Sequence, residues 1–230
     1  MSLLIAIESA TLSSKVIIAR DGRIIDESPV FKAENTSFEF QNFIHHSAAT
    51  NGFAISEIDF VSVDIGPGRL SATRSGVSFA NALAFSIGRP IVPLTYFDLI
   101  GYETACATRL PVACMVQASN GMGYVGLFDQ NKLQFMTYGT LLDRLAEATK
   151  GLGGYAIAGQ FSADFASALD LPAHRINASG MPSSQTILHR SLHAIEHGAT
   201  TRDPVEPITE QYGGFTPAPG AAGAKATIEP

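Results

Sequence analysis

The sequence predicts an α/β protein of two halves that share one element order, strand-strand-strand-helix-strand-helix. Short apolar runs bounded by Gly, Pro, Asn or Asp alternate with longer segments of helical spacing. The same order of elements then appears a second time, without obvious residue identity between the halves. We therefore expect a first domain over residues 1–108 and a second, degenerate domain over 109–212. A flexible tail is expected over 213–230, where Gly, Pro and Ala dominate.

Each expected element follows from a local pattern, such as Asp21-Gly22, which is typical of a hairpin turn between two strands. In the first half the expected strands are Leu3–Ile7, Val16–Ala19, Arg23–Glu27, Phe60–Ile65 and Ile91–Leu94, and the expected helices are Thr36–Thr50, Ser71–Ile87 and Thr95–Thr108. In the second half the expected strands are Val112–Ala118, Tyr124–Phe128, Leu133–Tyr138, Tyr155–Ala158 and a short one near Ala173–Ile176, and the expected helices are Leu141–Thr149, Phe161–Leu169 and Ser183–His197.

This repeated order is the outline of a known architecture. Three antiparallel strands followed by helix-crossed parallel strands, present twice, form the plan shared by actin, Hsp70 and sugar kinases (ASKHA), in which each half is ribonuclease H-like. We therefore predict two ribonuclease H-like halves, each βββαβα.

Composition excludes several classes of protein. The 230 residues are 46% hydrophobic, which excludes wholesale disorder, and the net charge of −6 disfavours direct binding of nucleic acid. Charged residues make up only 16%, against about 25% in an average domain, so part of the surface is either rich in small polar residues or covered by a partner. Cys106 and Cys114 have no metal-ligand spacing, and no apolar run is long enough to span a membrane. We expect a cytoplasmic protein without a disulfide framework.

Two small-residue turns are candidates for binding phosphate. In this architecture the turn after the first strand is short, so its backbone N–H groups can face an anion. A second such place is Gly66-Pro67-Gly68, which precedes a helix N-terminus. The candidate nucleotide- or phosphate-facing residues are Glu8, Ser9, Thr11, Gly66, Gly68, Ser71 and Arg74. The alternative interpretation of the glycine pair is a tight strand-to-helix turn without a ligand.

Carboxylates decide whether such turns can support phosphoryl transfer. A kinase or ATPase of this plan needs one carboxylate on each half's first turn, to position a metal and to act as a base. Glu8 fills the first position, but Gln117 stands at the second and cannot ionise. The sequence therefore argues against phosphoryl transfer by this chain alone.

Several segments, in this order, are similar to motifs of one family. They are Leu4-Ile5-Ala6-Ile7-Glu8-Ser9-Ala10-Thr11, Asp21-Gly22, Ile58 to Gly68 with its Gly-Pro-Gly ending, Arg69 to Gly76 with Arg74 and Gly76 kept, and Pro93 to Leu99. The chain from about Leu3 to Asp98, and more weakly to Tyr212, resembles the TsaB family, also called YeaZ, which is related to TsaD and to M22 peptidases. It looks like a divergent member, because Gln117-Ala118-Ser119-Asn120 replaces the family's D-A-R-R.

The resemblance implies a non-catalytic subunit of the complex that makes N6-threonylcarbamoyladenosine at position 37 of tRNA. Its implied partners are a TsaD-like catalytic protein and a TsaE-like protein, with a homodimer in isolation and tRNA reached only through the complex. It implies no cofactor in the isolated chain and no metal site, with ATP and Mg²⁺ expected, if bound, at the joint interface with TsaD. By position, the implied partner interface contains Phe40, Phe43, Ile44, Arg74, Val77, Ala80, Asn81 and Ala84.

Two other functions stay open from the residues. An independent small-molecule kinase or ATPase of the same fold would use Glu8, Gly66 and Gly68 around Mg-ATP. A metallopeptidase would use His189, His193 and His197, which recur one helical turn apart. The segment His189–His193 lacks the Glu of an HExxH base, so a solvent-facing stripe is the favoured interpretation of these histidines.

Overall fold

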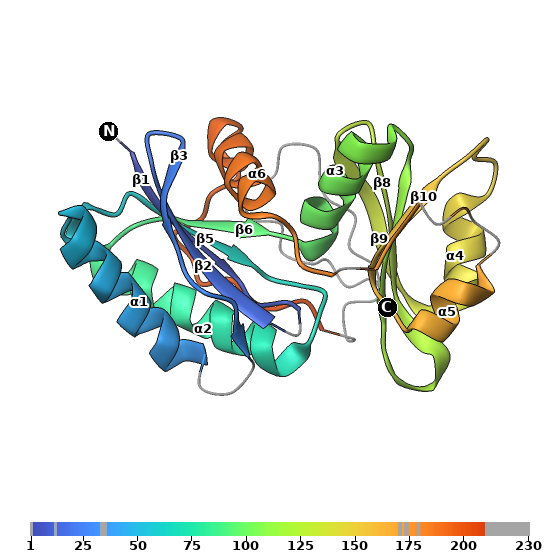
Figure 1. Ribbon diagram of the computed structural model, residues 1–230, viewed down its shortest axis with the longest axis horizontal. Coiled ribbons are helices and arrows are strands. Elements are labelled where there is room, and N and C mark those ends of the chain that lie inside the picture. The colour runs from blue at the N-terminus through green and yellow to red at the C-terminus, as the bar shows by residue number, and fades with distance from the viewer. Residues whose placement is uncertain are drawn as a thin grey trace. The chain divides into compact units, whose positions relative to one another are not determined.

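The computed structural model describes residues 2–11, 13–32, 36–169, 172, 175–178 and 180–209. The expected tail over 213–230 and part of the strand expected near residues 173–176 lie outside these ranges. The chain divides into two compact units. The first holds the residues up to Tyr96 together with Ser183–Pro207, and the second holds Phe97–Pro182. Each unit contains one sheet with helices packed on it (Figure 1).

The sheet of the first unit is organised around its first strand, β1. Its strands are β1 (Leu3–Glu8), β2 (Ser13–Arg20), β3 (Arg23–Glu27), β4 (Phe31–Lys32), β5 (Phe60–Asp64) and β6 (Ile91–Leu94). The order is β3-β2-β1-β5-β6, and β4 pairs with β2. β1 pairs antiparallel with β2 and parallel with β5. All six residues of β1 are buried, as its continuous apolar run predicts for a strand covered on both faces.

Helices cover both faces of this sheet. They are α1 (Thr36–Asn51), α2 (Leu70–Ile87) and α6 (Ser184–Glu196), with a one-turn 3-10 helix at Ile55–Glu57. The apolar core beneath α1 and α2 includes Ile5 and Ile7, whereas Leu4 packs with Leu188 of α6 on the opposite face (Figure 1). The buried side of α2 carries a small residue at every fourth position, which permits close packing on the sheet; these residues are Ala72, Gly76, Ala80 and Ala84.

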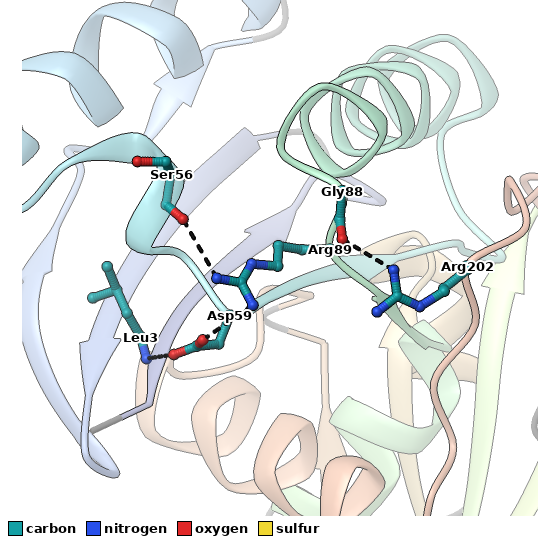
Figure 2. Close-up of polar contacts among 6 residues, drawn as sticks. All are labelled: Leu3, Ser56, Asp59, Gly88, Arg89 and Arg202. Atoms are coloured by element: carbon teal, nitrogen blue, oxygen red, sulfur yellow. Dashed lines mark hydrogen bonds and ion pairs between the residues drawn. The ribbon is translucent and has the colours of Figure 1, made fainter.

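Polar contacts join four segments of the first unit that are far apart in the sequence (Figure 2). Asp59, before β5, accepts a hydrogen bond from the Leu3 backbone N–H at 2.9 Å and forms an ion pair with Arg89 at 3.6 Å. Arg202, which follows α6, donates to the Gly88 carbonyl at 3.0 Å. Since Gly88 ends α2 in the left-handed conformation (φ 66°), this bond satisfies a carbonyl at the helix C-terminus.

The segment after α6 completes the edge of the same sheet. Thr201 and Ile91 of β6 exchange two backbone hydrogen bonds of 2.7 and 2.9 Å. Four residues later, the backbone of Val205 exchanges two bonds of 2.9 and 3.0 Å with the side-chain amide of Asn81 in α2. The first unit is therefore complete only with residues from the end of the described chain.

The second unit has the same plan with fewer strands. Its elements are α3 (Tyr96–Thr108), β7 (Val112–Gln117), β8 (Met122–Asp129), β9 (Lys132–Thr140), α4 (Leu141–Thr149), β10 (Ala156–Gln160), α5 (Ala163–Ala168) and β11 (Ile176–Asn177), with a 3-10 turn at Ser119–Gly121. The sheet order is β11-β10-β7-β8-β9. Residues of α4 and α5 pack against Met115 and Ile157, while Gly101 of α3 packs against Phe128 and Cys114.

The structure confirms the predicted fold class and nearly every expected element, within one to three residues at most ends. The strand pair made by β4 was not expected. The compact units also differ from the predicted domains 1–108 and 109–212, because all but the first residue of α3 lies in the second unit and α6 lies in the first. Among the described residues, no helix is long and apolar enough to cross a membrane.

Candidate functional site

The candidate site consists of two loops at the carboxyl ends of β1 and β5. Residues 8–11 begin with the last residue of β1, residues 64–69 begin with the last residue of β5, and we call these segments the paired loops. They meet because β1 and β5 are parallel neighbours, with Ile7 opposite Val63. The backbone N–H of Arg69 donates to the Ala10 carbonyl at 2.8 Å, which ties one loop to the other.

Gly68 makes this close approach possible. A Cβ atom added at this position would lie 2.0 Å from the Ala10 carbonyl oxygen and 2.8 Å from its carbonyl carbon. Gly68 thus serves backbone packing between the loops. Gly76 has a similar role in α2, because a Cβ there would lie 2.0 Å from the hydroxyl oxygen of Ser9. Among the described residues, that buried hydroxyl has no hydrogen-bond partner.

Glu8 is fully buried and binds the backbone of its own turn. Its Oε1 accepts a hydrogen bond from the Ala10 N–H at 3.1 Å, and its Oε2 lies 3.4 Å from the hydroxyl oxygen of Thr11. Thr11 donates to the Ser13 carbonyl at 2.7 Å. Burial raises the pKa of Glu8 from 4.5 to about 8, although the hydrogen bonds of Ala10 and Thr11 and the charge of Lys15 lower it. The N–H of Ala10, which was expected to face a phosphate, is therefore already bonded to a carboxyl group.

Asp64 is a second buried carboxyl at this edge, and the sequence analysis missed it. It is 1% exposed, and its Oδ1 accepts a hydrogen bond from the Gly66 N–H at 2.8 Å. Gly66 has a φ of 97°, which favours glycine, and its carbonyl accepts from the Tyr96 N–H. An Asp that ends an apolar strand just before Gly-Pro-Gly was the signal that could have found it.

Two of the candidate phosphate-facing residues lie outside the paired loops, on the exposed start of α2. Ser71 and Arg74 are both solvent-exposed, in the first two turns of the helix. The structure therefore brings Glu8, Ser9, Thr11, Gly66 and Gly68 together in the buried paired loops and leaves the other two candidates outside them.

The corresponding turn of the second unit also uses its side chain internally. Gln117 ends β7, and its Oε1 accepts a hydrogen bond from the Ser162 N–H at 2.8 Å. Ser162 in turn caps α5, where its hydroxyl accepts from the Phe165 N–H at 3.2 Å. Gln117 thus holds the loop that leads into α5. Among the described residues, no group of three His, Cys, Asp or Glu side chains is placed to hold a metal ion.

The expected partner-interface residues need correction. Five of them lie in the core of the first unit, where they are at most 3% exposed: Phe40, Ile44, Val77, Ala80 and Ala84. Phe43 is half-buried against the same core, Asn81 bonds to Val205, and Arg74 alone is exposed. The apolar spacing of α1 and α2 therefore marked the faces that pack on the sheet.

The outward face of α2 carries different residues. Leu70 and Phe85 are 37% and 91% exposed, and Arg74, Ser78 and Ala82 between them are exposed as well. These five positions recur at intervals of three or four residues, so they share one side of the helix. We call them the outer face of α2.

Gly68→Ala is predicted to lower the free energy of unfolding by ~1–3 kcal/mol, because the added methyl group must separate the paired loops. Urea denaturation measures this change. Gly153→Ala is the matched control, since a Cβ there meets no described atom within 4 Å. Equal stability of Gly68→Ala and the wild type would contradict the close packing of the loops.

Glu8→Gln is predicted to flatten the dependence of stability on pH. The folded protein holds the Glu8 proton more tightly than the unfolded chain does, so the free energy of unfolding falls as pH rises from about 4.5 to about 8. The glutamine does not titrate and keeps an acceptor for the Ala10 N–H. At pH 8.5 it should therefore be the more stable protein, by an amount on the order of a few kcal/mol. Urea denaturation from pH 5 to 9 tests this, with exposed Asp164→Asn as control; parallel profiles for Glu8→Gln and the wild type would refute it.

Solved structures share this fold. YeaZ from Pseudomonas aeruginosa superposes with a TM-score of 0.74 at 18% identity, covering 91% of this chain and all of that one. An uncharacterised protein similar to the peptidase YeaZ, also from Pseudomonas aeruginosa, gives 0.72 at 16% identity, covering 92% of this chain and all of that one. The likeness confirms the predicted two-lobed fold.

Sequence relatives carry one description, tRNA N6-adenosine threonylcarbamoyltransferase. The protein from Chloroherpeton thalassium is 42% identical over 43 residues, 19% of this chain and 12% of that protein. The one from Thermofilum pendens is 26% identical over 115 residues, 50% of this chain and 34% of that protein. The chain thus matches about a third or less of these relatives' length. Residues 8–185 match the family described as TsaD, tRNA N6-adenosine threonylcarbamoyltransferase, and the chain belongs to that family, with the fold of YeaZ.

Proposed function

We propose that this chain is a non-catalytic scaffold subunit of the complex that makes N6-threonylcarbamoyladenosine at position 37 of tRNA, and that it pairs with a TsaD-like catalytic subunit. The observation that carries the proposal is the internal use of both turns that an enzyme of this architecture needs for phosphate chemistry. Glu8 binds the Ala10 N–H of its own turn, and Gln117 binds the Ser162 N–H. Neither side chain is free to position a metal or a nucleophile in this arrangement.

The energetic argument concerns Glu8. A phosphate at the first turn would have to replace the Glu8 carboxyl at the Ala10 N–H. The displaced carboxyl would then lie buried without that partner, and an unsatisfied buried polar group costs ~1–3 kcal/mol, more when charged. An approaching phosphate would also repel any ionised Glu8. Both effects oppose nucleotide binding by the isolated chain, and ATP with Mg²⁺ is proposed only at a joint interface with the partner.

The outer face of α2 is the proposed contact for the TsaD-like partner. Its two large apolar residues, Leu70 and Phe85, lie at opposite ends of the face, and the residues between them include the small Ser78 and Ala82. Small residues such as Ser78 and Ala82 allow a second helix to approach closely, and aromatic residues are enriched among those that dominate binding. The same face is proposed for a homodimer when the partner is absent. A TsaE-like protein would join the pair, and tRNA would be bound through the complex.

Phe85→Asp is predicted to weaken binding of the cognate TsaD-like protein by roughly tenfold or more, because it places a charge in an apolar contact. Calorimetry with the purified partner measures the affinity. Leu142→Asp is the matched control, since Leu142 is also a large exposed hydrophobic residue (61%) but lies on α4 of the second unit. Unchanged affinity in Phe85→Asp, or an equal loss of affinity in both variants, would contradict the proposal that the outer face of α2 binds the partner.

Equilibrium dialysis with Mg-ATP separates the scaffold from the alternative, an independent small-molecule kinase or ATPase. The scaffold predicts no saturable binding by the isolated chain at millimolar ATP. The kinase predicts sub-millimolar binding that is lost in Glu8→Gln. The urea denaturation described above provides the control that each protein is folded.

A further inference from the structure

The outer face of α2 is nearly symmetric about its middle. A large apolar residue stands at each end, Leu70 at 37% exposure and Phe85 at 91% exposure, and the small Ser78 lies between them. Ser78 is about 12 Å from Leu70 and about 10.5 Å from Phe85 along the helix axis. A face with this symmetry can pack against a copy of itself.

Two copies of α2 that pack antiparallel, with Ser78 at the crossing, place unlike residues opposite each other. Leu70 of one copy then faces Phe85 of the other, and Arg74 faces Ala82, because the members of each pair are equally far from Ser78 to within one residue. The small residues at the crossing allow the helices to approach closely. A parallel arrangement would set Arg74 of one copy against Arg74 of the other, which like charges disfavour.

The segment after α6 runs along one side of α2. Its Arg202 donates to the Gly88 carbonyl at 3.0 Å, and its Val205 bonds to the side chain of Asn81 (Figure 2 shows the first contact). Gly88 and Asn81 are two helical turns apart and lie on one line along the helix, and Arg74 continues that line two turns further back. The segment therefore borders the outer face on the side that carries Arg74.

Asp203 gives this border an exposed negative charge. Its backbone N–H donates to the hydroxyl oxygen of Thr201 at 3.0 Å, and the proline ring of the next residue, Pro204, fixes the backbone φ there. The backbone that carries the carboxylate is thus held in place before any partner arrives. Among the described residues, neither the Asp203 carboxylate nor the exposed guanidinium of Arg74 takes part in an ion pair.

Antiparallel packing brings these two charges together. The two-fold axis reverses the direction of the helix but keeps its Arg74 side on the same side, so Arg74 of one copy lies beside the bordering segment of the other. The residue opposite Arg74 is Ala82, whose position along α2 falls between the two residues that hold this segment. We infer that a second copy of this chain packs antiparallel on the outer face of α2, with Arg74 of each copy paired to Asp203 of the other. The inference rests on the proposal that this face is the contact surface.

Sedimentation equilibrium of the untagged full chain at low salt tests the pair by exchanging its charges. The wild type should form a dimer at micromolar concentrations. Arg74→Glu and Asp203→Arg should each weaken the dimer by roughly tenfold or more, because each sets like charges against each other at two symmetric places. The double variant restores opposite charges, so its dimer should return to within about threefold of the wild type, which a merely structural defect would not do.

Arg23→Glu and Asp164→Arg are the matched controls, since they make the same charge changes at exposed positions of β3 and α5. Both should dimerise as the wild type does, and circular dichroism confirms that every variant is folded. A wild type that stays monomeric, an equal loss in the controls, or a double variant that is not restored would overturn the inference.

Calorimetry with the TsaD-like protein separates this inference from the proposed function. A chain that binds that protein but shows no charge-dependent dimer contradicts the inference alone. A chain whose dimer is lost in both single variants and restored in the double variant, but which does not bind the TsaD-like protein, supports the inference and contradicts the proposed function.

Discussion

The parallel pairing of β1 with β5 is the constraint on which the first unit depends. It places two strand ends at one edge of a sheet that is covered on both faces, so the loops that follow must turn within a confined space. Each loop is closed by the carboxyl group at its start, since Glu8 accepts from the Ala10 N–H and Asp64 from the Gly66 N–H. Buried carboxyl groups are costly to leave unsatisfied, and each turn supplies a backbone N–H donor to one oxygen of its carboxyl group.

Covering both faces of this sheet requires a helix from a distant part of the chain. α1 and α2 follow the first strands directly, but α6 comes after the whole second unit. The segment behind it then bonds to β6 through Thr201 and to α2 through Asn81 and Val205. The stability of the first unit therefore depends on contacts between its early strands and helices and residues 184–205, which follow the whole second unit.

The sequence predicted the elements well because each has a local cause. Apolar runs, helical spacing and turn residues act over a few positions, and they suffice for β3 (Arg23–Glu27) or α4 (Leu141–Thr149) to be predicted to the residue. Which sheet a helix covers is decided by contacts between distant residues, so α6 was predicted as a helix but assigned to the other half. Asp64 was missed for a related reason. Its role depends on the hydrogen bond from the Gly66 N–H, and the apolar pattern of the preceding strand does not predict that bond.

The prediction of the partner interface was wrong for a different physical reason. Apolar periodicity on a helix reports which side is buried, and it does not distinguish burial in the chain's own core from burial by a partner. Phe40 and Ala80 satisfy that periodicity because they face the sheet.

A partner surface on a helix whose apolar side is already used must be built from what remains. On α2 these are the small Ser78 and Ala82 and the charged Arg74, with Leu70 and Phe85 at the two ends. The scarcity of charge that marks the whole chain is therefore informative at this face. Between Leu70 and Phe85 the exposed positions at this spacing include one charged residue, Arg74. A partner that covered this face would therefore pay the desolvation cost of only one charge.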